Sequence, residues 1–124
     1  MKKNGVILDT NAVLRYLLKD NIEQAKQVGE LIKQDFNFLI LPEVIAEVIY
    51  VMTKNYSLDR VTVANILLKF ISIFEYNVIL NKALTIYKAT KLDFVDCVLC
   101  AYSNKYEVFT FDKDLKKFIN KTTS

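Results

Sequence analysis

The 124-residue sequence has no histidine and no tryptophan, and it contains only one proline, two glycines and two cysteines. So little proline and glycine, together with 52% apolar residues, excludes a collagen-like repeat and a disordered chain. Apolar runs are short, and none approaches the ~18 residues that a membrane helix requires. We therefore expect a single compact domain over residues 1–124, with no membrane segment, in the cytoplasm.

The two cysteines, Cys97 and Cys100, form a C-x-x-C pattern that could serve redox chemistry or half of a zinc site. A zinc site needs four nitrogen or sulfur ligands, and this chain has no histidine and no further cysteine to complete one. The neighbouring residues are apolar. We therefore interpret both cysteines as thiols packed inside a helix, which agrees with a reducing cytoplasm.

The charge is only mildly positive, and its distribution says more than its total. A formal net charge of +3 permits nucleic-acid binding without requiring it. Near the end of the chain, the segment DKDLKKFINK predicts a helix with most of its lysines near one side. These lysines are Lys113, Lys116, Lys117 and Lys121. They could bind RNA phosphates, or they could be the solvated face of a terminal helix.

The apolar pattern predicts strands that alternate with helices. Short apolar runs predict four strands, at residues 5–8, 36–41, 76–80 and 108–111. Apolar positions that recur every three or four residues predict helices after Asp9, at 22–32, 42–54, 58–73, 82–90 and 93–104, and after Asp112. Ser57 and Asn81 are the predicted N-caps of two of these helices. The helix at 93–104 is apolar almost all round and is therefore predicted to be buried.

Strands separated by helices imply right-handed crossovers between parallel strands. The predicted fold class is α/β: a three-layer α/β/α sandwich around a central parallel sheet of four or five strands. In such a sheet, the functional crevice lies beyond the carboxyl ends of the strands, where the following helices begin.

Four carboxylates are predicted to meet at this edge. Asp9 and Asp112 end the first and last strands, Glu47 lies about one turn into its helix, and Asp96 lies in the first turn of another. Asp96 interrupts the apolar sequence FVDCVLCA, where an isolated carboxylate would be costly. Clustered acids repel one another unless a cation lies between them. Oxygen ligands alone point to Mg²⁺ or Mn²⁺.

Each acid taken alone has an ordinary explanation. The acids that end strands could be turn formers or helix caps, and Glu47 could be a solvated helix residue. Two neighbours also compete for the same roles. Glu43 points away from the apolar stripe of its helix while Glu47 lies on the shoulder of that stripe, so we favour Glu47. Asp93 is predicted to be a helix cap or an auxiliary ligand, because Asp96 lies one turn deeper in its helix.

The first two acidic segments resemble motifs of the PIN-domain family. Asp9, Thr10 and Asn11 form the D-T-N sequence that ends the family's first strand. The segment LPEVIAEVIY looks like the family's second motif, with Glu47 as its glutamate. By this resemblance, Asn11 helps to orient the first aspartate.

The last two acidic segments extend the resemblance. DFVDCVLCA is similar to the third motif of the family, with Asp96 as its acid. TFDKDL is similar to the fourth, with Thr110 as the hydroxyl residue and Asp112 as the final acid. The four motifs follow the family's order over about 5–118. The compact length is most similar to that of the VapC-type toxins.

The resemblance implies a Mg²⁺- or Mn²⁺-dependent endoribonuclease. In this interpretation, one or two ions are held by Asp9, Glu47, Asp96 and Asp112, and they activate water for attack on an RNA phosphodiester. Asn11 and Thr110 then orient the ligands. No histidine is required as a base, and family analogy suggests products with 5′-phosphate and 3′-hydroxyl ends.

The toxin resemblance also implies a homodimer and a small antitoxin protein that covers the acidic cleft. Side chains around Tyr50, Tyr56, Phe70 and Phe74 could form either surface, with core packing as the alternative. A housekeeping PIN nuclease for RNA maturation and a non-catalytic binding module are the competing functions. A receiver-like signalling domain fits less well, because it would not explain Glu47 together with Asp96.

Overall fold

The computed structural model describes residues 5–123, and the chain divides after Ser57 into two compact units. The first unit contains β1 (Val6–Ile7), α1 (Thr10–Leu18), α2 (Ile22–Ile32), β2 (Phe38–Leu39) and α3 (Pro42–Lys54). The second contains α4 (Arg60–Ile71), α5 (Val78–Ala89), α6 (Phe94–Tyr102) and α7 (Lys113–Thr123). Within residues 5–123 the fold is therefore mixed α/β, with seven helices and one small sheet.

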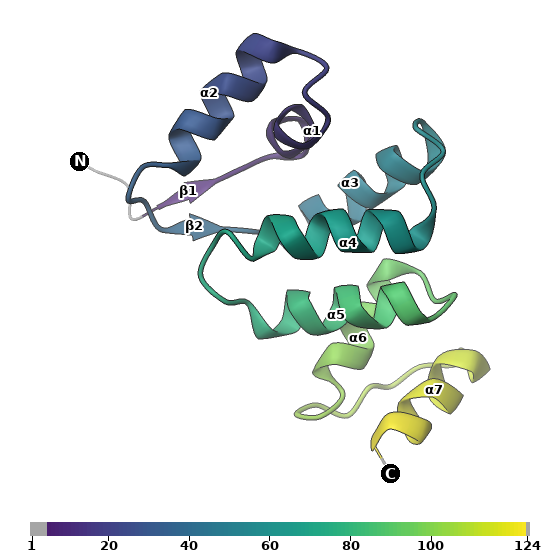
Figure 1. Ribbon diagram of the computed structural model, residues 1–124. Coiled ribbons are helices and arrows are strands. Elements are labelled where there is room, and N and C mark those ends of the chain that lie inside the picture. The colour runs from purple at the N-terminus through teal and green to yellow at the C-terminus, as the bar shows by residue number, and fades with distance from the viewer. Residues whose placement is uncertain (1–4, 124) are drawn as a thin grey trace. The chain divides into compact units, whose positions relative to one another are not determined.

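The sheet of the first unit consists of two parallel strands, β1 and β2. The helices α1 and α2 form the connection between these strands (Figure 1). Val6 lies opposite Phe38, and the backbone N–H of Val6 donates to the carbonyl of Asn37 at 2.8 Å. Gly5 permits this approach, because a Cβ atom at its position would lie 2.3 Å from the Asn37 oxygen. Because the two strands are parallel, the helices that follow them, α1 and α3, begin at the same edge of the sheet.

The helices of the first unit follow the predicted apolar periodicity. Asp9 caps the start of α1, and Lys19, in the left-handed conformation with φ 56°, caps its end. Asn21 caps α2, and Pro42 lies in the first turn of α3, where its missing N–H costs nothing. The predicted apolar stripe of α3 is confirmed, because four of its side chains are buried: Ile45, Val48, Ile49 and Met52.

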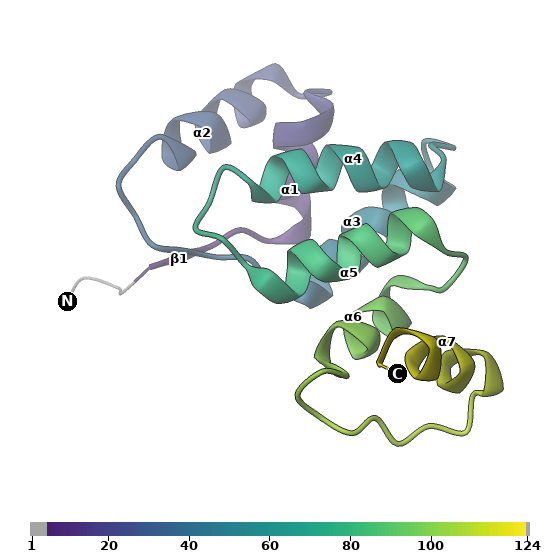
Figure 2. The ribbon, with the colours of Figure 1, turned by 60° about the horizontal axis from the view of Figure 1, so that its bottom comes forward.

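The second unit is built from helices. α4 and α5 pack side by side, α6 packs against α5, and α7 follows α6 (Figure 2). Asp59 caps α4, with its side chain accepting from the N–H of Thr62. The prediction of Ser57 as this cap is wrong, because Ser57 lies before the helix with a positive φ of 55°.

Two predicted strands of the second half are absent from the described structure. The segment 76–80 is not a strand, because Asn77 caps α5 and accepts from the N–H of Leu80 at 3.0 Å. Asn81, the predicted cap, lies inside that helix. The segment 108–111 has no ladder partner among residues 5–123, so the described sheet has two strands rather than four or five.

The prediction that the helix at 93–104 is buried holds for one side only. Phe94, Cys97, Cys100 and Ala101 are buried in α6. Val95 on the same helix is 60% exposed. Among the described residues, no helix combines the length and the apolar character that a bilayer span requires.

Candidate functional site

Asp9 lies where β1 leads into α1. Its Oδ1 accepts a hydrogen bond from the backbone N–H of Ala12 at 2.8 Å, so Asp9 is the N-cap of the helix. The carboxylate is exposed. A cap engages one carboxylate oxygen, and it also sets the direction of the side chain at the carboxyl end of the strand. The predicted position at a strand-to-helix junction is thus confirmed, while the predicted role as a ligand is not addressed by this geometry.

Glu47 is linked to the start of α1 through a hydroxyl group. The Oγ1 of Thr10 donates to Oε2 of Glu47 at 3.1 Å, although 37 residues separate the two. Thr10 directly follows Asp9, so the first and second acidic motifs meet within this unit. Glu43, the competing acid, lies in the first turn of α3, and both Glu43 and Glu47 are exposed. The contact with Thr10 favours Glu47.

Sequence reasoning gave Thr10 no role of its own, although it is the middle residue of the D-T-N motif. Its position directly after an acid at a strand end was the only signal. Asn11, which was expected to orient Asp9, is exposed in the first turn of α1.

Asp93 and Asp96 lie at the start of α6 in the second unit. Asp93 caps the helix, and its Oδ1 accepts from the N–H of Asp96 at 2.9 Å, which confirms the predicted cap. Asp96 is half-buried in the first turn. Partial burial raises the pKa of Asp96, and the nearby charges of Asp93 and Asp112 raise it further. The charges of Asp93 and Asp112 therefore oppose the ionisation of Asp96.

Asp112 occupies the turn that leads into α7. Its Oδ1 accepts from the N–H of Leu115 at 3.0 Å, and its own N–H donates to Oγ1 of Thr110 at 3.0 Å. Thr110 therefore holds the backbone of Asp112, and its role in orienting a metal ligand stays a prediction. The influence of Asp112 on the pKa of Asp96 connects the third and fourth motifs within the second unit.

The donor set has the chemistry that a hard divalent cation requires. Its candidate ligands are carboxylate oxygens. Partial burial is the main cause of the raised pKa of Asp96 and the charges of Asp93 and Asp112 add to it, so a cation nearby would favour the charged form of Asp96. Within residues 5–123, however, no group of three or more acids or thiols is arranged closely enough to hold a metal ion. The residues fit the ion by chemical type, and the metal site itself stays a prediction.

The two cysteines do not supply thiolate ligands. Cys97 and Cys100 are free and buried in α6, so the interpretation as packed thiols is confirmed. Burial raises the pKa of Cys97 to about 12 and also raises that of Cys100. The protonated thiol therefore dominates at neutral pH, whereas a metal-binding cysteine must be deprotonated.

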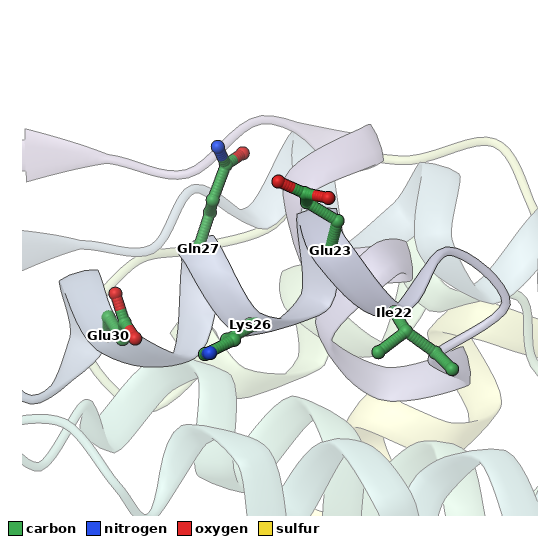
Figure 3. A pocket seen from close by; sticks show the side chains of 5 residues that line it. All are labelled: Ile22, Glu23, Lys26, Gln27 and Glu30. Carbon is green, nitrogen blue, oxygen red and sulfur yellow. The ribbon is translucent and has the colours of Figure 1, made fainter.

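The outer side of α2 contains a surface hollow of about 510 Å³. Five side chains of that helix line it, and Glu23 and Gln27 rise on the same side of the helix (Figure 3). The others are Ile22, Lys26 and Glu30. This lining mixes both signs of charge and includes none of the acids of the four motifs, so we do not assign the site to it.

The lysines of α7 form an exposed basic surface. Lys113, Lys116 and Lys117 are exposed, while Leu115 on the other side of the helix is only 1% exposed. The predicted helix is confirmed, and these lysines lie on its exposed surface. Binding of RNA by these lysines stays a prediction.

The chain is thus a mixed α/β protein with acidic residues at the starts of α1, α6 and α7. The family model described as PIN domain matches residues 6–120, and the chain therefore belongs to the PIN-domain family. PIN domains are generally nuclease modules that use a divalent metal and act on nucleic acid. Comparison with curated proteins and with solved structures gives no significant match.

Proposed function

We propose that this protein is a Mg²⁺- or Mn²⁺-dependent endoribonuclease. The observation that carries the proposal is the family match over residues 6–120, which includes all four acidic motifs. Two observations, one in each unit, support it. Thr10 donates a hydrogen bond to Glu47, and the charge of Asp112 raises the pKa of Asp96, which partial burial already raises. Each observation links residues of two different motifs.

The metal ligands that we propose are Asp9, Glu47, Asp96 and Asp112, with Asp93 as an auxiliary residue. When bound, the ion supplies Lewis-acid chemistry, lowering the pKa of water and neutralising charge on the scissile phosphate. The chain's own residues position these carboxylates. Helix-capping bonds from Ala12 and Leu115 orient the first and last acids, and Thr10 orients Glu47.

Contacts to the RNA backbone are proposed for Lys113, Lys116 and Lys117. Lysine is a compact point charge, and it binds phosphate without reading base edges. Because these lysines follow Asp112 directly, a bound phosphate would lie near one of the proposed ligands. Weak contacts of this kind predict an affinity for RNA that falls as the salt concentration rises.

The biological role that we propose is that of the toxin in a toxin–antitoxin pair, acting as a homodimer that a small antitoxin protein inhibits. We also propose that the whole chain forms a single domain of the three-layer α/β/α type, as expected for the family.

Of the aromatic residues suggested for an interaction surface, Tyr50 and Tyr56 are 63% and 45% exposed. Phe70 is buried at 2% and belongs to the core instead.

The experiment is incubation of the purified protein with total cellular RNA in Mg²⁺ or Mn²⁺, with EDTA as the negative control. Asp96→Asn removes a proposed ligand, and Asp114→Asn removes an exposed acid of α7 as a matched control. We expect discrete cuts with 5′-phosphate ends that need both metal and Asp96. Intact RNA under every condition would favour a non-catalytic binding module.

A second measurement separates the toxin from a housekeeping nuclease. Expression of the chain alone should arrest growth if it is a toxin, and Asp96→Asn should abolish the arrest. Normal growth at a comparable protein level, with RNA cleavage retained in vitro, would instead support a role in RNA maturation.

A further inference from the structure

Arg60, one of only two arginines in the chain, binds the end of α5 and the connection that follows it. Its Nε donates to the backbone carbonyl of Tyr87 at 3.1 Å, and its guanidinium also donates to the carbonyl of Leu92. The guanidinium carbon lies 3.7 Å from the centre of the Tyr87 ring. One side chain thus makes three contacts with a segment that begins 27 residues later.

The two carbonyls bound by Arg60 flank the connection between α5 and α6. Tyr87 lies in the last turn of α5, where carbonyls lack a partner within the helix. Leu92 directly precedes Asp93, the cap of α6. Its carbonyl also accepts from the Sγ of Cys97 at 3.8 Å. The connection is therefore held from α4 on one side and from α6 on the other.

The held connection leads straight into the acids of α6. The Oδ1 of Asp93 accepts from the N–H of Asp96, and its backbone carbonyl accepts from the N–H of Cys97 at 3.0 Å. Any displacement of Leu92 therefore moves the cap and the first turn of α6, which contains Asp96. Among residues 5–123, Arg60 forms no ion pair with a carboxylate, so its contacts with this segment are to carbonyls and a ring.

We propose that Arg60 is a positioning residue, which fixes the turn from Asp93 to Asp96 by clamping the carbonyls of Tyr87 and Leu92. Its significance for catalysis rests on the proposed function, in which Asp96 is a metal ligand. Arginine suits this role because its planar fork can donate to two acceptors at once while its face covers an aromatic ring. Lysine keeps the charge but lacks the fork.

The test compares Arg60→Met and Arg60→Lys with Arg15→Met. Arg15, the other arginine, is the control, because its ion pair with Asp20 and its hydrogen bond to Gln24 lie in the first unit. Amide hydrogen exchange is measured on the metal-free protein, and Mn²⁺ affinity is measured without RNA. We expect exchange at Asp96 and Cys97 to rise at least ~10-fold in Arg60→Met while amides in the middle of α4 stay protected.

Mn²⁺ affinity should fall about 10-fold in Arg60→Met, as is typical when a partner behind a ligand is lost, and Arg60→Lys should restore part of it. Arg15→Met should change neither quantity. The proposal is overturned if Asp96 and Cys97 exchange as in the wild type, or if all three variants raise exchange uniformly. If Arg60→Met does not fold, the exchange rates of the Asp96 and Cys97 amides in Arg60→Lys test the proposal instead.

The experiment also separates this proposal from the nuclease proposal. A wild-type protein that binds no Mn²⁺ and cleaves no RNA would refute the proposed function, whereas the exchange data would still decide whether Arg60 positions the turn. Normal Mn²⁺ binding with unchanged exchange in the Arg60 variants would refute the positioning role alone.

Discussion

Replacing Gly5 with alanine should destabilise the protein through one defined contact. The new Cβ would lie 2.3 Å from the carbonyl oxygen of Asn37, whereas ordinary contacts begin at 3.4 Å. Because this oxygen belongs to the backbone and cannot rotate away, β1 and β2 must separate by roughly 1 Å. Overpacking of this kind lowers the free energy of unfolding by about 1–3 kcal/mol. For a chain of this length, that corresponds to a Tm lowered by roughly 4–12 °C.

Gly29→Ala is the matched control. A Cβ at Gly29 would meet only the Tyr16 ring, at an ordinary distance of 3.7 Å, and Gly29 lies inside α2. Alanine there should stabilise the helix by about 0.5–1 kcal/mol. Thermal unfolding followed by circular dichroism measures both variants. An unchanged Tm in Gly5→Ala, or equal losses in the two variants, would refute the pairing of β1 with β2 described above.

Two further predictions concern single side chains. Thr10→Val removes the 3.1 Å hydrogen bond to Glu47 and should lower RNA cleavage about 10-fold. The loss of stability should be only about 1 kcal/mol, because the pair is exposed. Thr85→Val is the control: the hydroxyl of Thr85 donates within α5, so its loss should leave cleavage unchanged. Burial raises the pKa of Cys97 to about 12. At pH 8 its thiolate fraction should therefore be roughly 10³-fold below that of an unfolded cysteine. The rate at which Cys97 is alkylated in the native protein, measured by mass spectrometry, should be lower by the same factor. Because the folded-state pKa is the higher one, stability should decline as the pH rises from about 9 to about 12. Rapid alkylation of Cys97 in the native protein would contradict its burial.

Most of the helices and the capping acid Asp93 could be predicted from the sequence because both depend on local contacts, whereas the cap of α4 was predicted at Ser57 instead of Asp59. The apolar stripe of α3 and the cap at Asp93 involve residues only a few positions apart. The segment 76–80 shows where local reasoning failed. Its valine and isoleucine favour a strand. However, the side chain of Asn77 accepts a hydrogen bond from the N–H of Leu80, and Leu80 is buried in the core, and both features stabilise a helix.

Strand pairing and contacts between residues distant in the sequence could not be predicted in the same way. The segment 108–111 has the composition of a strand, but a strand exists only through a partner that no local pattern identifies, and Phe109 and Phe111 are both 86% exposed. The contact between Thr10 and Glu47 spans 37 residues. Only the fold brings such residues together, so sequence reasoning found the acids and missed the hydroxyl.

The central proposal, which the structure leaves untested, is that four acids from four motifs bind one metal ion. It is tested most directly by titrating Mn²⁺ into the RNA-free protein and into the variants Asp9→Asn, Glu47→Gln, Asp96→Asn and Asp112→Asn. Glu43→Gln and Asp114→Asn serve as controls, since both are exposed acids in the first turns of their helices. The account predicts that each of the four variants weakens Mn²⁺ binding at least ~10-fold and that neither control does. Equal binding in the wild type and in all six variants would contradict it.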